Sequence, residues 1–227
     1  MPGMMPEMMP GVELPLAVCG YLAIALIWPT WSTWRRSGVW PVVFHREAAP
    51  LQRAAGLIFA VMLLGLVGWS LRIGLGDPAE QGVVAVPVAI CGTGWLLVAA
   101  GTVITRSAQV TMGRSWRIGI DDRPTELVTH GPFRWSRNPI FAGMTLTLGG
   151  FLLVAPSLAS LCLVAVLVAS IQVQVRFEEL HLLARQGDAY RRYAARVGRF
   201  VPWWGRIGSS PRPTSEADSS RTPEVVK

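Results

Sequence analysis

Residues 140–175 read IFAGMTLTLGGFLLVAPSLASLCLVAVLVASIQVQV, which is two apolar runs joined by three residues, Ala155, Pro156 and Ser157. A hydrocarbon core of about 30 Å needs about 20 apolar residues in a helix that rises about 1.5 Å per residue, so runs of this kind are typical of transmembrane helices. Proline lacks the amide hydrogen that would continue a helix. This stretch therefore predicts a membrane-embedded helical hairpin, residues 140–154 and 158–175.

Three further apolar runs precede the hairpin, at residues 12–28, 54–71 and 82–104. Hydrophobic residues make up 51% of the chain and charged residues only 15%, a composition that excludes an ordinary soluble domain. We expect an all-α integral membrane protein with about five transmembrane helices. Its three cysteines fall inside these runs without metal-ligand spacing, so no metal site is expected.

Basic residues gather in the segments after the first, third and fifth apolar runs. The second loop instead carries Arg72 beside Asp77 and Glu80. Since short arginine-rich loops stay in the cytoplasm, the pattern predicts an inner (cytoplasmic) membrane protein with its N-terminus outside and its C-terminus in the cytoplasm. It also explains the net charge of +7 and indicates membrane lipids as neighbours, whereas nothing resembles a soluble nucleic-acid-binding module.

The two ends of the chain differ from the rest in composition. The start, MPGMMPEMMP, lacks the basic region of a signal peptide, and the tail is rich in Ser, Pro and charge. We therefore expect a disordered N-terminus (residues 1–11), three transmembrane helices (12–104), a functional core of loop, hairpin and C-terminal helix (105–208), and a disordered tail (209–227).

The segment after the hairpin, residues 176–202, reads RFEELHLLARQGDAYRRYAARVGRFVP and keeps a helical period that Gly187 can interrupt. It predicts an amphipathic helix at the membrane interface. Glu178 and Glu179 lie where this helix leaves the membrane. They are either a solvated helix start paired with nearby arginines or an acidic pair held there to bind a polar ligand, since ionisable groups at membrane depth are costly.

The loop before the hairpin ends in HGPFRWSRNPIFAG, residues 130–143. Gly131 and Pro132 set a turn, and a proline after Asn138 starts the next helix. The two arginines between them are thereby held in a short, constrained segment. They are either ordinary positive-inside residues or a grip for a carboxylate or phosphate.

Taken in order, GPFRWSRNPIFAG, an apolar hairpin and EELHLLARQGDAYRRYAARVGRFVP resemble a known family, the isoprenylcysteine carboxyl methyltransferase and phospholipid methyltransferase superfamily. Its pattern is roughly G-P-[YF]-R-x-x-R-[HN]-P-x-[YF]-x-G, then E-E-x-x-L, a [FY]-G-x-x-[YW]-x-x-Y element and a closing Arg-Phe-x-Pro. The resemblance covers about residues 113–203. It implies that S-adenosylmethionine binds at the cytosolic face between the loop and the C-terminal helix, and that the methyl group passes to a lipophilic small molecule, a lipid or a prenylated-cysteine-like carboxylate delivered by the membrane.

The resemblance also implies site residues. Asn138 and Phe141 replace the histidine and tyrosine of Arg-His-Pro-x-Tyr, so no imidazole or phenol at these positions can bind cofactor or move a proton. The catalytic residues implied are Arg137, Asn138 and Glu179. The cofactor-binding residues implied are His130, Gly131, Pro132, Arg134, Arg137, Asn138, Pro139, Phe141, Glu178 and Glu179.

Displacement at a sulfonium methyl group needs in-line positioning and a desolvated nucleophile more than a strong acid or base. We hypothesise that Arg137 and Arg134 bind a carboxylate of cofactor or substrate. Glu178 and Glu179 would bind the cofactor's amino group or ribose hydroxyls, and Asn138 would make a neutral hydrogen bond. O- and N-methyl transfer both stay open, as does the oligomeric state.

Two other functions compete with this hypothesis. Membrane sterol reductases, which use NADPH, look similar around Ser136, Arg137 and Pro139, although they usually carry more than five spans. A non-enzymatic membrane scaffold would use the arginine loop only to hold lipid head groups.

Overall fold

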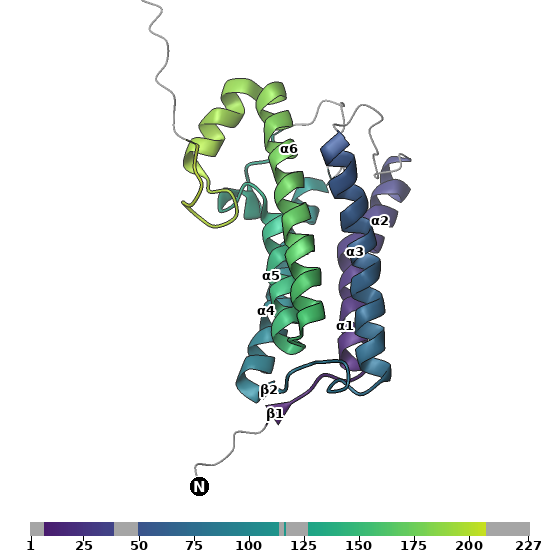
Figure 1. Ribbon diagram of the computed structural model, residues 1–227. Helices are drawn as coiled ribbons and strands as arrows, with labels where there is room; N and C mark the ends of the chain where they lie inside the picture. Colours follow the sequence, from purple (N-terminus) through teal and green to yellow (C-terminus); the bar gives the residue numbers. More distant parts are fainter. Residues whose placement is uncertain (1–6, 39–49, 114–115, 117–126, 208–227) are drawn as a thin grey trace, which may run out of the picture.

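The computed structural model describes residues 7–38, 50–113, 116 and 127–207. Helices dominate these residues, and they run side by side along one direction (Figure 1). The elements are β1 (Glu7–Met8), α1 (Glu13–Leu22), the π-helical turn η1 (Ala23–Ile27), α2 (Trp28–Ser37), α3 (Pro50–Leu75), β2 (Val86–Pro87), α4 (Val88–Met112), the 3-10 helix η3 (Gly131–Arg134), α5 (Pro139–Val154) and α6 (Leu158–Arg196).

The protein is an all-α, multi-pass membrane protein. Within the described residues, four helical stretches are long and apolar enough to cross a membrane: Glu13–Ser37, Pro50–Leu75, Val88–Met112 and Leu158–Arg196. Large apolar side chains point outward along them, including Leu64 (74% exposed) and Leu96 (72% exposed). Such a surface suits lipid rather than water.

Each of the five predicted apolar runs contains a helix, although the helix of the third run starts only at Val88 and not at residue 82. The helix of the fourth run, α5, is the short one. α5 has 16 residues, or about 24 Å of helix, which is less than the hydrocarbon core of about 30 Å. The expected five spans are therefore four of full length and one short helix within the described part of the chain. The first run also extends further than predicted, to Ser37, through the π-helical turn.

Glycines bring α4 and α5 into backbone contact. A Cβ at Gly101 would lie 2.5 Å from the carbonyl oxygen of Gly143, and a Cβ at Gly143 would lie 2.6 Å from that of Gly101. The arrangement is repeated two turns away: a Cβ at Gly94 would lie 2.9 Å from the carbonyl oxygen of Gly150, and a Cβ at Gly150 would lie 2.6 Å from that of Gly94. Small residues allow such close approach of membrane helices, so these four positions set the distance between α4 and α5.

The predicted hairpin between α5 and α6 is present. Ser157 caps α6: its hydroxyl accepts a hydrogen bond from the Ser160 amide at 3.1 Å, and the Ser160 hydroxyl accepts one from the Ser157 amide at 2.9 Å. This reciprocal arrangement is a capping box, which satisfies two amides that a helix start leaves unpaired. α6 then packs against α3, and α3 against α1.

Disorder was predicted at both ends of the chain. The structure corrects this prediction for part of the N-terminal segment, and the remaining residues lie outside the described ranges. Glu7 and Met8 pair with Pro87 and Val86 in an antiparallel bridge, so the predicted disorder of residues 1–11 is wrong for residues 7–11. The backbone groups of this segment find partners in the loop before α4. Residues 1–6 and the predicted disordered tail, 209–227, lie outside the described residues.

The predicted interfacial helix is a continuation of α6. α6 runs unbroken through Glu178 and Glu179 and bends at Gly187, which has φ 48° and ψ −119°. Only glycine adopts a positive φ of this kind readily. After the bend the last turns of α6 fold across the end of the bundle (Figure 1), at the end where α5 begins.

Candidate functional site

The residues after α6, which we call the C-terminal strap (residues 197–205), pair with the start of α5. The Arg137 amide donates to the carbonyl oxygen of Gly198 at 2.9 Å, and the Asn138 amide to that of Arg199 at 3.1 Å. The Ser136 hydroxyl donates to the same Arg199 oxygen at 3.0 Å. A Cβ at Gly198 would overlap the carbonyl oxygen of Val201, so the strap can make this tight turn only with glycine there.

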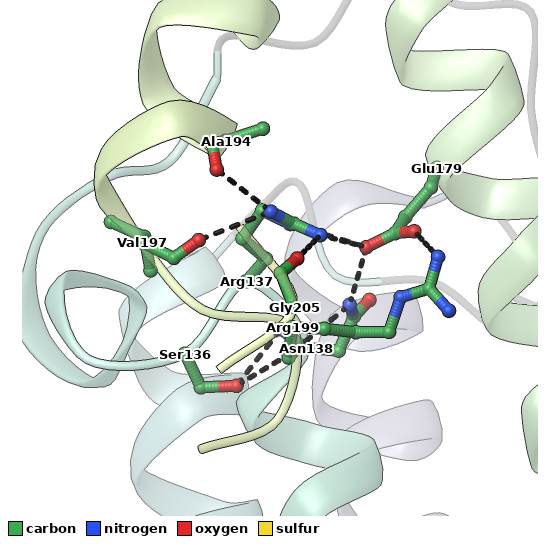
Figure 2. A network of polar contacts seen from close by, with 8 residues as sticks. All are labelled: Ser136, Arg137, Asn138, Glu179, Ala194, Val197, Arg199 and Gly205. Atoms are coloured by element: carbon green, nitrogen blue, oxygen red, sulfur yellow. Dashed lines mark hydrogen bonds and ion pairs between the residues drawn. The ribbon is translucent and has the colours of Figure 1, made fainter. Parts of the chain in front are cut away.

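Arg137 ties the strap to α6 (Figure 2). Its Nη1 donates to the carbonyl oxygens of Ala194 at 2.9 Å and Val197 at 3.1 Å. Its Nη2 donates to the carbonyl oxygen of Gly205 at 3.0 Å and to Glu179 Oε1 at 2.9 Å, and its Nε donates to the same oxygen at 3.2 Å. A guanidinium has five N–H groups. All five of Arg137 are therefore used within the protein.

Glu179 is the centre of the polar network. Oε1 accepts from Arg137 and from Asn138 Nδ2, the latter at 3.2 Å, while Oε2 accepts from Arg199 Nη2. The side chains of Glu179 and Arg137 are 7% and 1% exposed, whereas that of Arg199 is 30% exposed. We call these four residues the Glu179 cluster. Two guanidiniums face one carboxylate in it, so these groups together carry one excess positive charge.

Several polar groups beside the cluster have no partner in the described part of the chain. Arg199 uses one guanidinium nitrogen on Glu179, and its remaining N–H groups make no hydrogen bond to a described residue. Glu178, half-buried on the same helix, makes no hydrogen bond or ion pair with a described residue either. The Tyr190 hydroxyl is buried and unpaired. These groups offer a ligand the cationic donors of Arg199, the carboxyl group of Glu178 and the hydroxyl of Tyr190.

The structure brings Arg137, Asn138 and Glu179 together as predicted, and it places the other predicted residues around or away from them. Pro139 is the buried first residue of α5, and Phe141 packs against the apolar core. Arg134 is exposed and outside the cluster.

The remaining predicted residues form the turn before α5. His130 is exposed, and Pro132 is half-buried in η3. Gly131 has φ 59°, and a Cβ there would lie 2.9 Å from Thr111 Oγ1, so this turn rests against α4. The turn positions the loop but contributes no side-chain donor or acceptor to the cluster among the described contacts.

The role predicted for Arg137 needs revision. With five donors on internal acceptors, Arg137 has none left for a ligand carboxylate. Its geometry instead fixes the Glu179 carboxylate and the strap.

Sequence reasoning missed Arg199 as a member of the Glu179 cluster, and it missed Tyr190 and Tyr193, which lie close to the cluster on α6. Arg199 opens the closing Arg-Phe-x-Pro, and Tyr190 and Tyr193 are the aromatic positions of the element before it. The Tyr193 hydroxyl donates to the Phe133 carbonyl oxygen at 2.7 Å and so joins α6 to the loop. Their positions in the family pattern were the only feature of the sequence that could have indicated these three residues.

Comparisons with known proteins agree on one family. Residues 89–188 match the family described as phospholipid methyltransferase. The chain is 27% identical over 165 residues to methanethiol S-methyltransferase 1 of Bradyrhizobium diazoefficiens, covering 68% of this chain and 55% of that protein. It is 30% identical over 115 residues to probable protein-S-isoprenylcysteine O-methyltransferases of Oryza sativa (subspecies indica and japonica), covering 48% of this chain and 60% of each relative.

The matches thus span little more than half the length of these relatives. The matched family region runs from α4 to just beyond the bend at Gly187, and it contains Arg137, Asn138 and Glu179. Through this region, the chain is similar to proteins of the isoprenylcysteine carboxyl methyltransferase and phospholipid methyltransferase superfamily of integral membrane methyltransferases.

Proposed function

We propose that the chain transfers a methyl group from S-adenosylmethionine to a lipophilic acceptor that reaches the site from the membrane. The observation that carries this proposal is the Glu179 cluster at one end of the helix bundle, of which Arg137, Asn138 and Glu179 are buried and lie in the matched family region. Nearby polar groups without described protein partners support it, because a bound ligand can use them as donors and acceptors.

The unpaired groups fit the amino-acid end and the ribose of S-adenosylmethionine. Arg199 has free N–H donors for a carboxylate, and Glu178 has a carboxylate for an ammonium group or ribose hydroxyls. Arg137 then acts as a positioning residue: it holds Glu179 and the strap in one arrangement before any ligand binds. Preorganisation of this kind lowers the entropy cost of binding and alignment.

The strap also supports delivery from the membrane. Its Val201, Trp203 and Trp204 are 58, 69 and 80% exposed. Tryptophan side chains are enriched where a membrane protein meets the lipid head groups. A strap held at this depth places the cluster where the reactive head of a lipid or a prenylated-cysteine-like molecule lies.

S-adenosylmethionine supplies an electrophilic methyl group when it is bound. The residues of the chain need only bind, align and exclude water, because methylation of a carboxylate requires no base. An amine acceptor would have to lose a proton. Glu178 is the carboxylate beside the cluster that has no described partner and could take it.

Arg199 should matter for ligand binding, whereas a neighbouring arginine should not. Arg199→Ala is expected to weaken binding of S-adenosylhomocysteine by about tenfold or more, since an ion pair between the ligand carboxylate and a part-buried guanidinium is lost. Isothermal titration calorimetry in detergent measures this affinity. Arg196→Ala is the matched control, because Arg196 is exposed and its side chain bonds only the Arg192 carbonyl oxygen among the described contacts.

Transfer of a labelled methyl group from S-adenosylmethionine to a lipid extract and to a prenylated-cysteine compound, read by mass spectrometry, tests the activity itself. Labelled product with wild type and Arg196→Ala, but much less with Arg199→Ala, supports the proposal. Equal losses in both arginine variants would show that removal of a positive charge, and not the site, is responsible.

We further propose that the end of the bundle with the site faces the cytoplasm of a bacterial inner membrane. α2 and α4 finish at this end, and they carry Arg35, Arg36 and Arg106 in their C-terminal halves; α3, which has Arg72 in its last turn, finishes at the other end (Figure 1). Basic residues favour the cytoplasmic side. A green fluorescent protein fused to the C-terminus should fluoresce, and alkaline phosphatase in its place should be inactive; the reverse pattern would contradict this orientation.

A further inference from the structure

Tyr190 is a buried polar residue that the role assignments above leave unused. It lies on α6 just after the bend at Gly187, and its side chain is 1% exposed. Its hydroxyl has no hydrogen-bond partner in the described structure. Ala194, one turn further along α6, accepts a hydrogen bond from Arg137 at 2.9 Å. Tyr190 therefore lies in the part of α6 that adjoins the Glu179 cluster.

Tyr193, one turn further along α6, is a buried tyrosine whose hydroxyl does have a hydrogen-bond partner. The two rings pack edge to face, with their centroids 6.2 Å apart. The Tyr193 hydroxyl donates to the Phe133 carbonyl oxygen at 2.7 Å, so its hydrogen bond serves the fold. Tyr190 is as deeply buried, at 1% against 4% exposure, but makes no such bond.

A buried hydroxyl without a partner costs about 1–3 kcal/mol, and most such groups in folded proteins are paired. No described residue accepts a hydrogen bond from the Tyr190 hydroxyl, which leaves this donor available to a ligand group. The Glu179 cluster beside it carries an excess positive charge, which favours an anionic ligand group. A phenol donates a hydrogen bond well to a carboxylate oxygen.

We propose that Tyr190 is a cofactor-binding residue whose hydroxyl donates a hydrogen bond to the carboxylate of the methionine part of S-adenosylmethionine, the same carboxylate that Arg199 binds. This inference rests on the proposed function. The bend at Gly187 contributes to this arrangement, because it lets the last turns of α6, which carry Tyr190, fold across the end of the bundle where α5 begins. The adenosine part carries no anionic group, so Tyr190 should not contribute to its binding.

The test uses Tyr190→Phe, Tyr193→Phe and two ligands, S-adenosylhomocysteine and its decarboxylated analogue, which lacks only the carboxylate. Tyr190→Phe is expected to weaken binding of S-adenosylhomocysteine by about tenfold to a hundredfold, the range for a hydrogen bond to a charged group. It should leave the affinity for the decarboxylated analogue unchanged. Without ligand its melting temperature should equal or exceed that of wild type, because no hydrogen bond is lost.

Tyr193→Phe is the reference for a structural role. It should lower the melting temperature and change the affinity for the two ligands by a similar factor. If Tyr190→Phe behaves in the same way, or leaves the affinity for S-adenosylhomocysteine unchanged, the role of Tyr190 is overturned while the proposed function stands. A wild-type protein that binds neither ligand overturns the proposed function and this inference together.

Discussion

Glu179→Ala is expected to destabilise the protein by about 3–5 kcal/mol, because it leaves the buried guanidinium of Arg137 without its counter-charge. Arg137 loses two hydrogen bonds, and Asn138 and Arg199 lose one each. The Arg137 side chain is 1% exposed, so water cannot replace the carboxylate without opening the site. Unfolding monitored by circular dichroism in detergent measures the loss.

In the Glu179→Ala variant, the hydrogen bonds between the strap and the start of α5 should open more often than those within the helices. The Arg137 and Asn138 amides bond strap carbonyl oxygens, and hydrogen exchange at these two amides should accelerate more than at amides within α4 or α5. Glu178→Ala is the matched control, since Glu178 is the adjacent residue, is of the same type and makes no hydrogen bond or ion pair with a described residue. Equal destabilisation by the two alanine variants would contradict the structural role assigned to the Glu179 cluster.

Gly143→Val is expected to destabilise the protein by about 3 kcal/mol, at the upper end of the usual cost of overpacking. A Cβ at this position would lie 2.6 Å from the Gly101 carbonyl oxygen and 2.8 Å from the Thr105 amide nitrogen. These are backbone atoms of α4, so the clash is relieved only if the two helices separate. The same unfolding measurement in detergent tests this.

Gly149→Ala provides the control on the same helix. Nothing lies within 4 Å of a Cβ at Gly149, so alanine there should be neutral or should stabilise α5, because it has a higher helix propensity than glycine by about 1 kcal/mol. If Gly143→Val and Gly149→Ala were equally stable, close packing of α4 on α5 would be the wrong explanation for these glycines.

The helices were predictable because each depends on a local pattern. Apolar runs of membrane length, Pro156 as a turn and Gly187 as an interruption all act on their own neighbourhood in the chain. The pairing of Glu7 and Met8 with residues of the loop before α4 was not predictable, because two residues without an alternating pattern say nothing about a partner almost 80 positions away.

The site was predictable only in part, for a related reason. Resemblance to the family placed Arg137, Asn138 and Glu179 in one site, and the structure brings them together. The sequence could not predict that all five N–H groups of Arg137 bond within the protein. Three of its acceptors are backbone carbonyl oxygens, which every residue type carries. The part played by Arg199 depends on the direction in which the strap returns after the bend at Gly187, and a sequence pattern does not encode that direction.

Titration of the purified wild-type protein in detergent with S-adenosylhomocysteine and, separately, with NADPH distinguishes the proposed methyltransferase from a reductase and from a scaffold. We expect saturable binding of S-adenosylhomocysteine that is weakened in Arg199→Ala and kept in Arg196→Ala, with no binding of NADPH. Binding of NADPH alone would contradict a methyltransferase in favour of a reductase, and binding of neither ligand would contradict it in favour of a scaffold.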